Sequence, residues 1–223
     1  MTKELFFQAI CKFVLGAVLI GILLFIPAGT FQYWNAWLFM GILFVPMFFA
    51  GIVLMVKNPE LLKKRLQAKE EQAEQSFVIK CSGLMFVAGF VIAGLNFRFQ
   101  WIVLPDQVVW TGAVLFLLSY LLYAEVLREN TYLSRTVEVQ EGQKVIDTGL
   151  YGIVRHPMYS ATIIMFLSMP IVLGSVISFA IFLFYPFIIA KRIKNEEEVL
   201  ANELEGYIEY QKKVKYRMLP FLW

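Results

Sequence analysis

Residues 158–190 read MYSATIIMFLSMPIVLGSVISFAIFLFYPFIIA, a run of 33 residues without a charged side chain. As one helix this run would be roughly 50 Å long at about 1.5 Å per residue, whereas the hydrocarbon core of a bilayer is about 30 Å thick. Pro170, Gly174 and Ser175 supply turn chemistry near its middle. The run therefore predicts a tight hairpin of two short membrane helices, and the alternative is one long kinked helix.

Four further apolar segments precede this run, and each is long enough to cross a bilayer, which takes about 20 residues. They are Leu5–Ile26, Phe31–Val56, Phe77–Phe97 and Val108–Leu127. Hydrophobic residues make up 59% of the 223 and charged residues 17%, against roughly 45–50% and about 25% in soluble domains. This composition excludes a soluble enzyme, a disordered regulator and a secreted disulfide scaffold. We expect an all-α, polytopic integral membrane protein with about six transmembrane helices and two free thiols, Cys11 and Cys81.

The basic residues decide between the hairpin and the single long helix, because Lys and Arg gather on the cytoplasmic side of membrane proteins. With the hairpin, 19 of the 20 Lys and Arg residues lie on the cytoplasmic side and Arg98 alone lies outside. With one long helix, the basic tail from residue 191 onward would lie outside. We therefore expect both termini in the cytoplasm, in the cell membrane or, in a eukaryote, the endoplasmic reticulum membrane. The net charge of +3 is too small to indicate nucleic acid as a partner.

The chain divides into two regions by the distribution of its ionisable residues. Residues 1–127 contain the first four spans, with an interfacial helix expected near 58–75 because Asn58 and Pro59 form a helix start. The alternative for that segment is a solvated connector. Residues 128–223 contain a cytoplasmic loop, the hairpin and a tail helix, and they hold most of the candidate reactive groups. Within the loop, the alternation of Thr136–Gln140 predicts a short extended piece.

Two polar segments flank the hairpin and would meet at the same membrane interface. His156, the single histidine, stands between Arg155 and Pro157 at a helix start, where free N–H groups favour an anionic ligand group. One histidine without a cysteine cluster does not make a metal site, so we expect no metal. After the hairpin, Arg192 and Glu196–Glu198 form either a solvated helix with an Arg192–Glu196 ion pair or a ligand-binding helix. The residues alone thus indicate a cytoplasmic pocket with an anion-favouring helix start and a carboxylate-rich helix.

Short motifs surround the hairpin in a fixed order, and that order and spacing make the signal fairly specific. They are Gly149-Leu150-Tyr151, Arg155-His156-Pro157-Met158-Tyr159, Arg192-x-x-x-Glu196-Glu197-x-x-Leu200, Tyr207-x-x-Tyr210 and Pro220. Together they resemble the isoprenylcysteine carboxyl methyltransferase family and its relatives, the membrane phospholipid methyltransferases. The resemblance covers about residues 125–223, and the preceding residues match only as generic spans.

The resemblance implies methyl transfer from S-adenosylmethionine, bound in a cytoplasmic pocket without a soluble Rossmann fold. It implies that the cofactor is bound by Tyr151, Arg155, His156, Tyr159 and Glu196. It implies that the catalytic residues at the acceptor end are Arg192 and Glu197. In-line displacement at the methyl carbon needs positioning more than acid–base power. Arg192 would orient a carboxylate acceptor, and Glu197 would take the proton from an amine acceptor; which glutamate contacts the cofactor stays open.

The alternatives come from other classes of protein. A membrane sterol or steroid reductase shares a similar Arg-His-Pro element but uses NADPH, and the Arg-x-x-x-Glu-Glu helix favours the methyltransferase over it. A non-enzymatic transporter or scaffold should place ionisable residues inside the spans, where charges are nearly absent. Besides the bilayer, we expect a lipophilic or prenylated acceptor as the partner. Prenylcysteine, a lipid amine, an isoprenoid acid and a small lipophilic thiol all remain open as acceptors.

Overall fold

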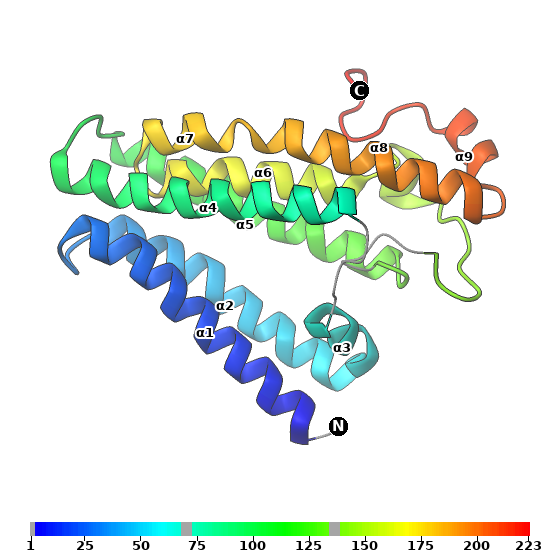
Figure 1. The fold of residues 1–223 in the computed structure, drawn as a ribbon, viewed down its shortest axis with the longest axis horizontal. Coiled ribbons are helices and arrows are strands. Elements are labelled where there is room, and N and C mark those ends of the chain that lie inside the picture. Colours follow the sequence, from blue (N-terminus) through cyan, green and yellow to red (C-terminus); the bar gives the residue numbers. More distant parts are fainter. Residues whose placement is uncertain (1–2, 68–72, 134–138) are drawn as a thin grey trace.

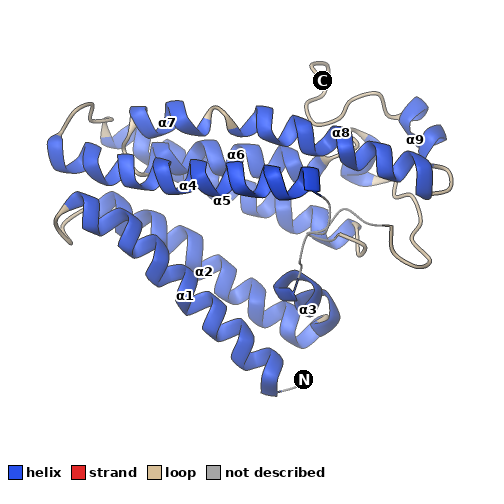
Figure 2. Cartoon of the chain, viewed as in Figure 1, coloured by secondary structure: helices blue, strands red, loops and turns tan. Residues whose placement is uncertain are grey.

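The computed structural model describes residues 3–67, 73–133 and 139–223, and within these ranges every regular element is a helix (Figures 1 and 2). The all-α prediction is therefore confirmed. The helices in chain order are α1 (Lys3–Ala28), α2 (Trp34–Lys57), α3 (Pro59–Gln67), α4 (Ala73–Phe99), α5 (Asp106–Glu129), the 3₁₀ turn η1 (Gly149–Gly152), α6 (Pro157–Val172), α7 (Val176–Phe182), α8 (Tyr185–Glu203) and α9 (Tyr207–Lys213).

The described part of the chain contains five helical stretches that are long and apolar enough to cross a membrane. Helices α1, α4 and α5 contain three of the predicted N-terminal spans, and α2 contains the predicted span Phe31–Val56 except for its first three residues, which precede the helix. The fifth runs through α7 and α8 from Val176 to Glu203, and α6 is apolar but shorter, with 16 residues. The protein is thus a multi-pass membrane protein, and the count of six spans stays a prediction because α6 falls below the usual length.

The uncharged run folds as a hairpin rather than as one kinked helix. Helix α6 ends at Val172, Gly174 adopts a left-handed φ of +72°, and the Ser175 side chain caps α7 by accepting a hydrogen bond from the Ser178 amide. A left-handed residue is accessible to glycine without a steric penalty, which explains why the chain reverses here. Pro170 lies inside α6 instead of in the turn. Helix α7 then packs back along α6 (Figure 1).

Two buried polar side chains at the start of α2, those of the preceding Tyr33 and of Asn35, hold the hairpin turn in place. The Tyr33 hydroxyl donates to the Leu173 carbonyl at 2.6 Å, and the Asn35 amide donates to the Val172 carbonyl at 3.1 Å. These bonds satisfy carbonyl groups at the end of α6 that have no partner within the helix. The turn is therefore tied to an element more than 130 residues earlier in the chain.

Small residues let the helices that carry the site approach closely. Helices α5 and α6 make the most extensive contact, and a Cβ atom at Gly112 would lie 2.7 Å from the Ile171 side chain. The same holds between α1 and α4, where a Cβ atom at Gly94 would lie 2.6 Å from the Leu24 carbonyl. Close backbone approach of this kind is how membrane helices gain packing energy. Helices α1 and α2 lean away from the other helices toward α3 (Figure 1).

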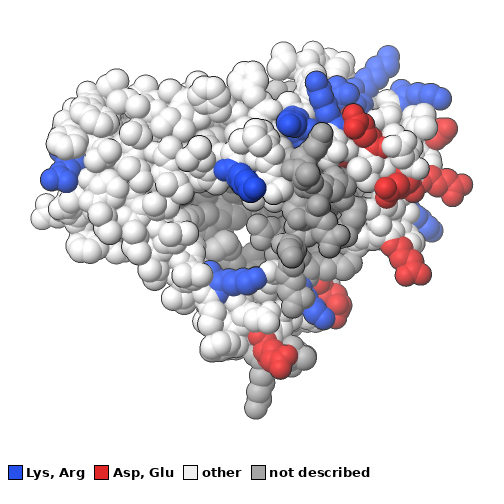
Figure 3. Space-filling model, viewed as in Figure 1, with Lys and Arg blue, Asp and Glu red and all other residues white. Residues whose placement is uncertain are grey.

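The charged side chains gather at one end of the molecule, around the end of α8 and α9 and beside α3, while the hairpin-turn end carries few of them (Figure 3). Helix α3 begins as predicted, since the Asn58 side chain accepts a hydrogen bond from the Leu61 amide at 3.1 Å. The predicted interfacial helix near 58–75 is shorter, because α3 ends at Gln67 and residues 73–75 already belong to α4. Residues 68–72 lie outside the described ranges.

Candidate functional site

A cavity opens at the charged end of the molecule, between the start of α6, the middle and end of α8, α9 and the loop that precedes η1. Its cavity volume is about 100 Å³, and about 830 Å³ of empty space lies between the wall residues when the open solvent at its mouth is included. Its wall is formed by Asn130, Tyr132, Leu133, Gln143, Lys144, Val145, Ile146, Tyr151, Arg155, His156, Met158, Tyr159, Arg192, Glu196, Leu200, Leu204, Tyr207 and Tyr210.

One face of α8 gives the cavity its polarity. Arg192, Glu196, Leu200 and Leu204 follow one another at intervals of four residues and all line the cavity. Residues four apart lie on the same helix face, and this stretch spans about 18 Å at 1.5 Å per residue. The cavity therefore runs from a charged part near the membrane to an apolar part near the end of α8.

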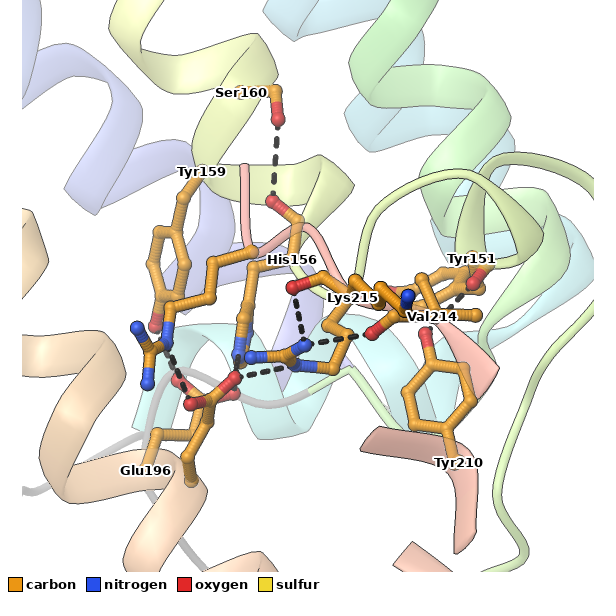
Figure 4. A network of polar contacts seen from close by, with 11 residues as sticks. Tyr151, His156, Tyr159, Ser160, Glu196, Tyr210, Val214 and Lys215 are labelled. Carbon is orange, nitrogen blue, oxygen red and sulfur yellow. Dashed lines mark hydrogen bonds and ion pairs between the residues drawn. The ribbon is translucent and has the colours of Figure 1, made fainter. Parts of the chain in front are cut away.

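Tyr159, on the first turn of α6, bridges the two charged residues of α8. Its hydroxyl donates to a Glu196 carboxylate oxygen at 2.6 Å and accepts from the Arg192 Nε at 2.8 Å. Figure 4 shows the Tyr159 and Glu196 side chains directed toward one another across the gap between the helices. A hydroxyl that donates to an anion and accepts from a cation holds both in a defined position.

The adjacent Glu197 lies on another face of α8 and has no place on the cavity wall. Its side chain is 6% exposed, compared with 23% for Glu196. One carboxylate oxygen accepts from the Arg155 Nε at 2.7 Å and lies 3.2 Å from the His156 Nε2, and the other accepts from the Arg217 Nε at 2.7 Å. The negative group beside His156 is thus supplied by the chain itself. The two neighbouring carboxylates have different surroundings, because Glu196 faces the cavity and Glu197 faces Arg155, His156 and Arg217.

The C-terminal segment closes over the start of α6 through backbone hydrogen bonds. The Arg155 guanidinium donates to the carbonyls of Val214 and Lys215 at 2.6 and 2.9 Å, as Figure 4 shows. The amides of Arg155 and His156 donate to the carbonyls of Tyr216 and Arg217. The guanidinium of Arg155 therefore links α6, α8 and the tail at once.

The Gly149-Leu150-Tyr151 motif forms η1 and places Tyr151 in the cavity wall. Gly149 has a φ of +52°, and a Cβ atom there would lie only 1.4 Å from a Glu129 carboxylate oxygen. That carboxylate accepts a hydrogen bond from the Leu150 amide at 3.0 Å. Only glycine fits this combination of backbone angle and close neighbour. Burial raises the pKa of Tyr151, so its hydroxyl stays neutral and accepts from the Asn130 side chain at 3.0 Å.

The structure brings together most of the residues that the sequence singled out. Six of them line the cavity, whereas Glu197 lies behind its wall; the six are Tyr151, Arg155, His156, Tyr159, Arg192 and Glu196. Two further residues of the site were not predicted from the sequence: Arg217, which donates to the Glu197 carboxylate, and Tyr207, which lines the cavity. Tyr207 belongs to the Tyr-x-x-Tyr motif, which was the available signal. Of the predicted extended piece, residues 136–138 lie outside the described ranges.

A second hollow lies against the first, on the side of the membrane helices. It is formed between α4, α6 and α8, with about 1030 Å³ of empty space, and its wall is mostly apolar. Met158, Tyr159 and Arg192 belong to the walls of both hollows. We call the second hollow the membrane groove; its other lining residues are Val78, Ile79, Ser82, Gly83, Phe86, Tyr123, Thr162, Phe166, Tyr185 and Ile189.

Comparison with known proteins gives two kinds of similarity. A stretch of 91 residues, which is 40% of this chain, is 29% identical to the Delta(14)-sterol reductase TM7SF2 of Mus musculus. A stretch of 93 residues is 26% identical to the Delta(14)-sterol reductase of Methylotuvimicrobium alcaliphilum. The chain spans about a fifth (22%) of the length of either reductase. Residues 108–202 match the model of the isoprenylcysteine carboxyl methyltransferase (ICMT) family, a region that contains α6, α7, most of α8 and the charged part of the cavity. The resemblance to the ICMT family that the motifs predicted is therefore confirmed over residues 108–202.

Proposed function

We propose that this protein is an S-adenosylmethionine-dependent membrane methyltransferase whose acceptor is a lipophilic molecule with an anionic head group. The observation that carries the proposal is the shared wall of Met158, Tyr159 and Arg192, where a polar cavity meets a mostly apolar groove between α4, α6 and α8. A reaction between a water-soluble donor and a membrane-bound acceptor requires such a junction. The match of residues 108–202 to the ICMT family supports methyl transfer as the reaction.

The residues of the cavity fit the charges of the proposed cofactor. S-Adenosylmethionine carries a sulfonium and an ammonium group, and the half-buried carboxylate of Glu196 offers a negative charge on the cavity wall. Leu200, Leu204 and Val145 provide apolar surface for the adenine ring at the other end. A cation beside a partly buried carboxylate is favoured because the local dielectric constant is low. Glu196, Tyr159 and Tyr151 would hold the cofactor in this arrangement.

When held by Glu196, Tyr159 and Tyr151, S-adenosylmethionine would supply an electrophilic methyl group for a carboxylate oxygen of the acceptor, and the electron pair of the carbon–sulfur bond would stay on sulfur. The protein's contribution is to align the acceptor and to exclude water. Arg192 lies at the junction, held by its Nε contact with the Tyr159 hydroxyl. In this position it binds a carboxylate head group while the lipophilic tail occupies the membrane groove.

Glu197 acts as a positioning residue in this proposal rather than as a base. Its carboxylate already accepts from Arg155 and Arg217 and lies beside His156. A carboxylate with these partners strongly favours the ionised form and has no free face toward the cavity. This supports an anionic acceptor, which needs no proton removed, over an amine acceptor, which does.

Cofactor binding by the purified protein in detergent tests the first half of the proposal. Isothermal titration should show saturable binding of S-adenosylmethionine to the wild type. Glu196→Gln should weaken that binding by roughly tenfold, because an ion pair in a half-buried site becomes a neutral hydrogen bond. Glu198→Gln is the matched control, since Glu198 is exposed on the same helix and should leave the affinity unchanged. Equal affinity in both variants would remove Glu196 from the cofactor site.

Filling the membrane groove tests the acceptor half. Gly83 lines the groove, and a Cβ atom there meets nothing within 4 Å, so Gly83→Leu fills the groove without backbone strain. With radiolabelled methyl donor and a membrane lipid extract, Gly83→Leu should lose most of the labelled lipid product while keeping cofactor affinity. Gly16→Leu on α1 is the control, because its Cβ position is equally open but lies outside the groove. Undiminished product in Gly83→Leu would place the acceptor elsewhere.

The second candidate function is a sterol or steroid reductase, favoured by the identity of 26–29% to two Delta(14)-sterol reductases over 40% of the chain. That activity would require NADPH, a polyanion. The Glu196 carboxylate on the cavity wall repels phosphate groups, which supports the sulfonium cofactor instead. Thermal stabilisation by S-adenosylmethionine against stabilisation by NADPH separates the two functions, because a bound ligand raises the unfolding temperature.

A further inference from the structure

Tyr207, at the start of α9, has a buried hydroxyl that lacks a hydrogen-bond partner among the described residues. The residue is 3% exposed, and it forms part of the cavity wall. A buried hydroxyl without a partner is rare in folded proteins, because it gives up its hydrogen bonds to water without replacement. Such a group therefore points to a partner beyond the described residues, and its place in the cavity wall makes a bound ligand that partner.

The other tyrosines of the cavity wall show that this is a property of Tyr207 alone. Their hydroxyls all have partners within the protein: Tyr132 donates to the Gly142 carbonyl, Tyr210 donates to the Tyr151 carbonyl, Tyr151 accepts from Asn130, and Tyr159 bridges Glu196 and Arg192. Each of these four hydroxyls thus has a hydrogen-bond partner within the protein. The Tyr207 hydroxyl belongs to the same wall but has no hydrogen-bond partner among the described residues.

The protonation state of Tyr207 makes it a hydrogen-bond donor. Burial raises the pKa of Tyr207, and the negative charges of Glu197 and Glu196 raise it further. The hydroxyl therefore stays neutral at physiological pH and keeps its proton for a ligand.

The position of Tyr207 along the cavity indicates which part of a ligand it meets. Its backbone follows Leu204, at the apolar part, and its amide donates to the Leu204 carbonyl. Its side chain also shares the cavity wall with Glu196, at the charged part. An extended adenosyl ligand with its amino-acid part at Glu196 and its base near Leu204 has its sugar between the two.

We propose that Tyr207 is a ligand-binding residue whose hydroxyl donates a hydrogen bond to the ribose of the nucleoside cofactor. The identity of that cofactor rests on the proposed function, while the unpartnered hydroxyl does not. Glu196 recognises charge and the leucines of α8 recognise the base, so Tyr207 adds recognition of the sugar hydroxyls. A ribose oxygen of the ligand then accepts the hydrogen bond that the Tyr207 hydroxyl does not donate within the described part of the protein.

The test compares Tyr207→Phe with Tyr210→Phe, two substitutions that each remove one buried hydroxyl from the same helix. Without ligand, Tyr207→Phe should unfold at the wild-type temperature or above, because it removes a polar group that has no partner. Tyr210→Phe should unfold about 2–4 °C lower, because it breaks the bond to the Tyr151 carbonyl. A lowered unfolding temperature in Tyr207→Phe would show that the hydroxyl has a structural partner such as an ordered water, and would overturn the proposal.

Affinity for S-adenosylhomocysteine and for its 2′-deoxy and 3′-deoxy analogues supplies the second readout. Tyr207→Phe should weaken binding of S-adenosylhomocysteine on the order of tenfold. One of the two deoxy analogues should bind the wild type more weakly by a similar factor and should bind Tyr207→Phe without further loss, since both changes remove the same contact.

The outcomes separate this proposal from the proposed function. If the wild type binds S-adenosylhomocysteine and Tyr207→Phe binds it equally well, the ribose contact is wrong and the proposed function stands. If both deoxy analogues lose affinity equally in the wild type and in Tyr207→Phe, the hydroxyl meets another part of the ligand and the ribose contact is again wrong. If the wild type binds no adenosyl ligand, both proposals fail.

Discussion

The guanidinium of Arg155 donates a 2.7 Å hydrogen bond to the carboxylate of Glu197, 42 residues later in the chain, and both side chains are only 6% exposed. This pair joins the start of α6 to the middle of α8. Through the same guanidinium it also holds the carbonyls of Val214 and Lys215 in the C-terminal segment. The cavity keeps its shape because three segments that are distant in sequence converge on one buried ion pair.

Removing the charge of Glu197 should therefore destabilise the protein as a whole. Glu197→Gln leaves Arg155 and Arg217 with reduced compensation in a buried site, which costs about 3–5 kcal/mol when one partner of a buried pair is lost. Thermal unfolding in detergent, followed by circular dichroism, measures the loss. Glu198→Gln, on the exposed face of α8, should unfold as the wild type does. Similar stability in both variants would contradict a structural role for the Arg155–Glu197 pair.

Removing the Tyr159 hydroxyl should lower turnover more than it lowers cofactor affinity. Tyr159→Phe breaks the link between Arg192 and Glu196, so that the guanidinium at the groove junction is no longer held in position. Misplacement of an orienting group reduces kcat, and we expect a loss of about tenfold or more. Tyr132→Phe is the control, because its hydroxyl lines the cavity but bonds only the Gly142 carbonyl among the contacts described for it. Equal kcat values for the two variants would argue against the bridge.

Arg192→Gln should strongly lower the rate of methyl transfer to anionic acceptors. It should leave cofactor affinity within about twofold of the wild type, because the residue acts at the acceptor end. The loss of one charge-stabilising donor is worth on the order of 10²-fold in kcat. Single-turnover methyl transfer to a lipid carboxylate, with cofactor bound beforehand, isolates this step. The control is Lys194→Gln, since Lys194 is exposed on the same helix. A large loss of cofactor affinity in Arg192→Gln would move the residue to the cofactor end.

Gly149→Ala should damage the site through backbone strain and through a clash together. The left-handed φ alone costs about 1 kcal/mol for a residue with a Cβ atom, and here the Cβ atom would also displace the Glu129 carboxylate from the Leu150 amide. Gly142→Ala separates the two effects, because Gly142 has a φ of +70° but open space around it. We expect a larger drop in unfolding temperature for Gly149→Ala, with weaker cofactor binding in this variant only. Equal drops in unfolding temperature for the two variants would mean that the Glu129 carboxylate can move away from a Cβ atom at position 149 without loss of stability.

Membrane topology can be tested with introduced cysteines after Cys11 and Cys81, which are free thiols, have been replaced by serine. Asp106, exposed at the start of α5, should react with an impermeant maleimide in intact cells when changed to cysteine. Glu209, exposed on α9, should react as cysteine only after permeabilisation. This pattern follows from the asymmetry of Lys and Arg. Labelling of position 209 from outside would invert the orientation and place the cavity on the wrong side for a cytoplasmic cofactor.

Much of the membrane architecture could be predicted from the sequence, because the bilayer acts on local composition. A segment such as 108–127 needs only about 20 apolar residues to satisfy the hydrocarbon core, and backbone hydrogen bonding then enforces a helix whatever its neighbours are. The hairpin followed from its length and from Gly174, whose left-handed φ is a local property of the chain. The helix start at Asn58 was likewise predictable, since a capping side chain accepts a hydrogen bond from a backbone amide in the first turn of the helix that follows it.

The division of roles between Glu196 and Glu197 was decided only by the tertiary structure. The two residues are chemically identical neighbours, and about 100° of helix rotation separates them. Which one faces the cavity depends on how α8 is rotated against α6 and the tail, and that rotation is fixed by Arg155 and Arg217, which are 42 and 20 residues away from Glu197. The unpartnered hydroxyl of Tyr207 is equally invisible in the sequence, where Tyr207 and Tyr210 look alike. Local composition determined where the helices lie, and long-range polar contacts, which no local pattern encodes, determined what the residues at their ends can do.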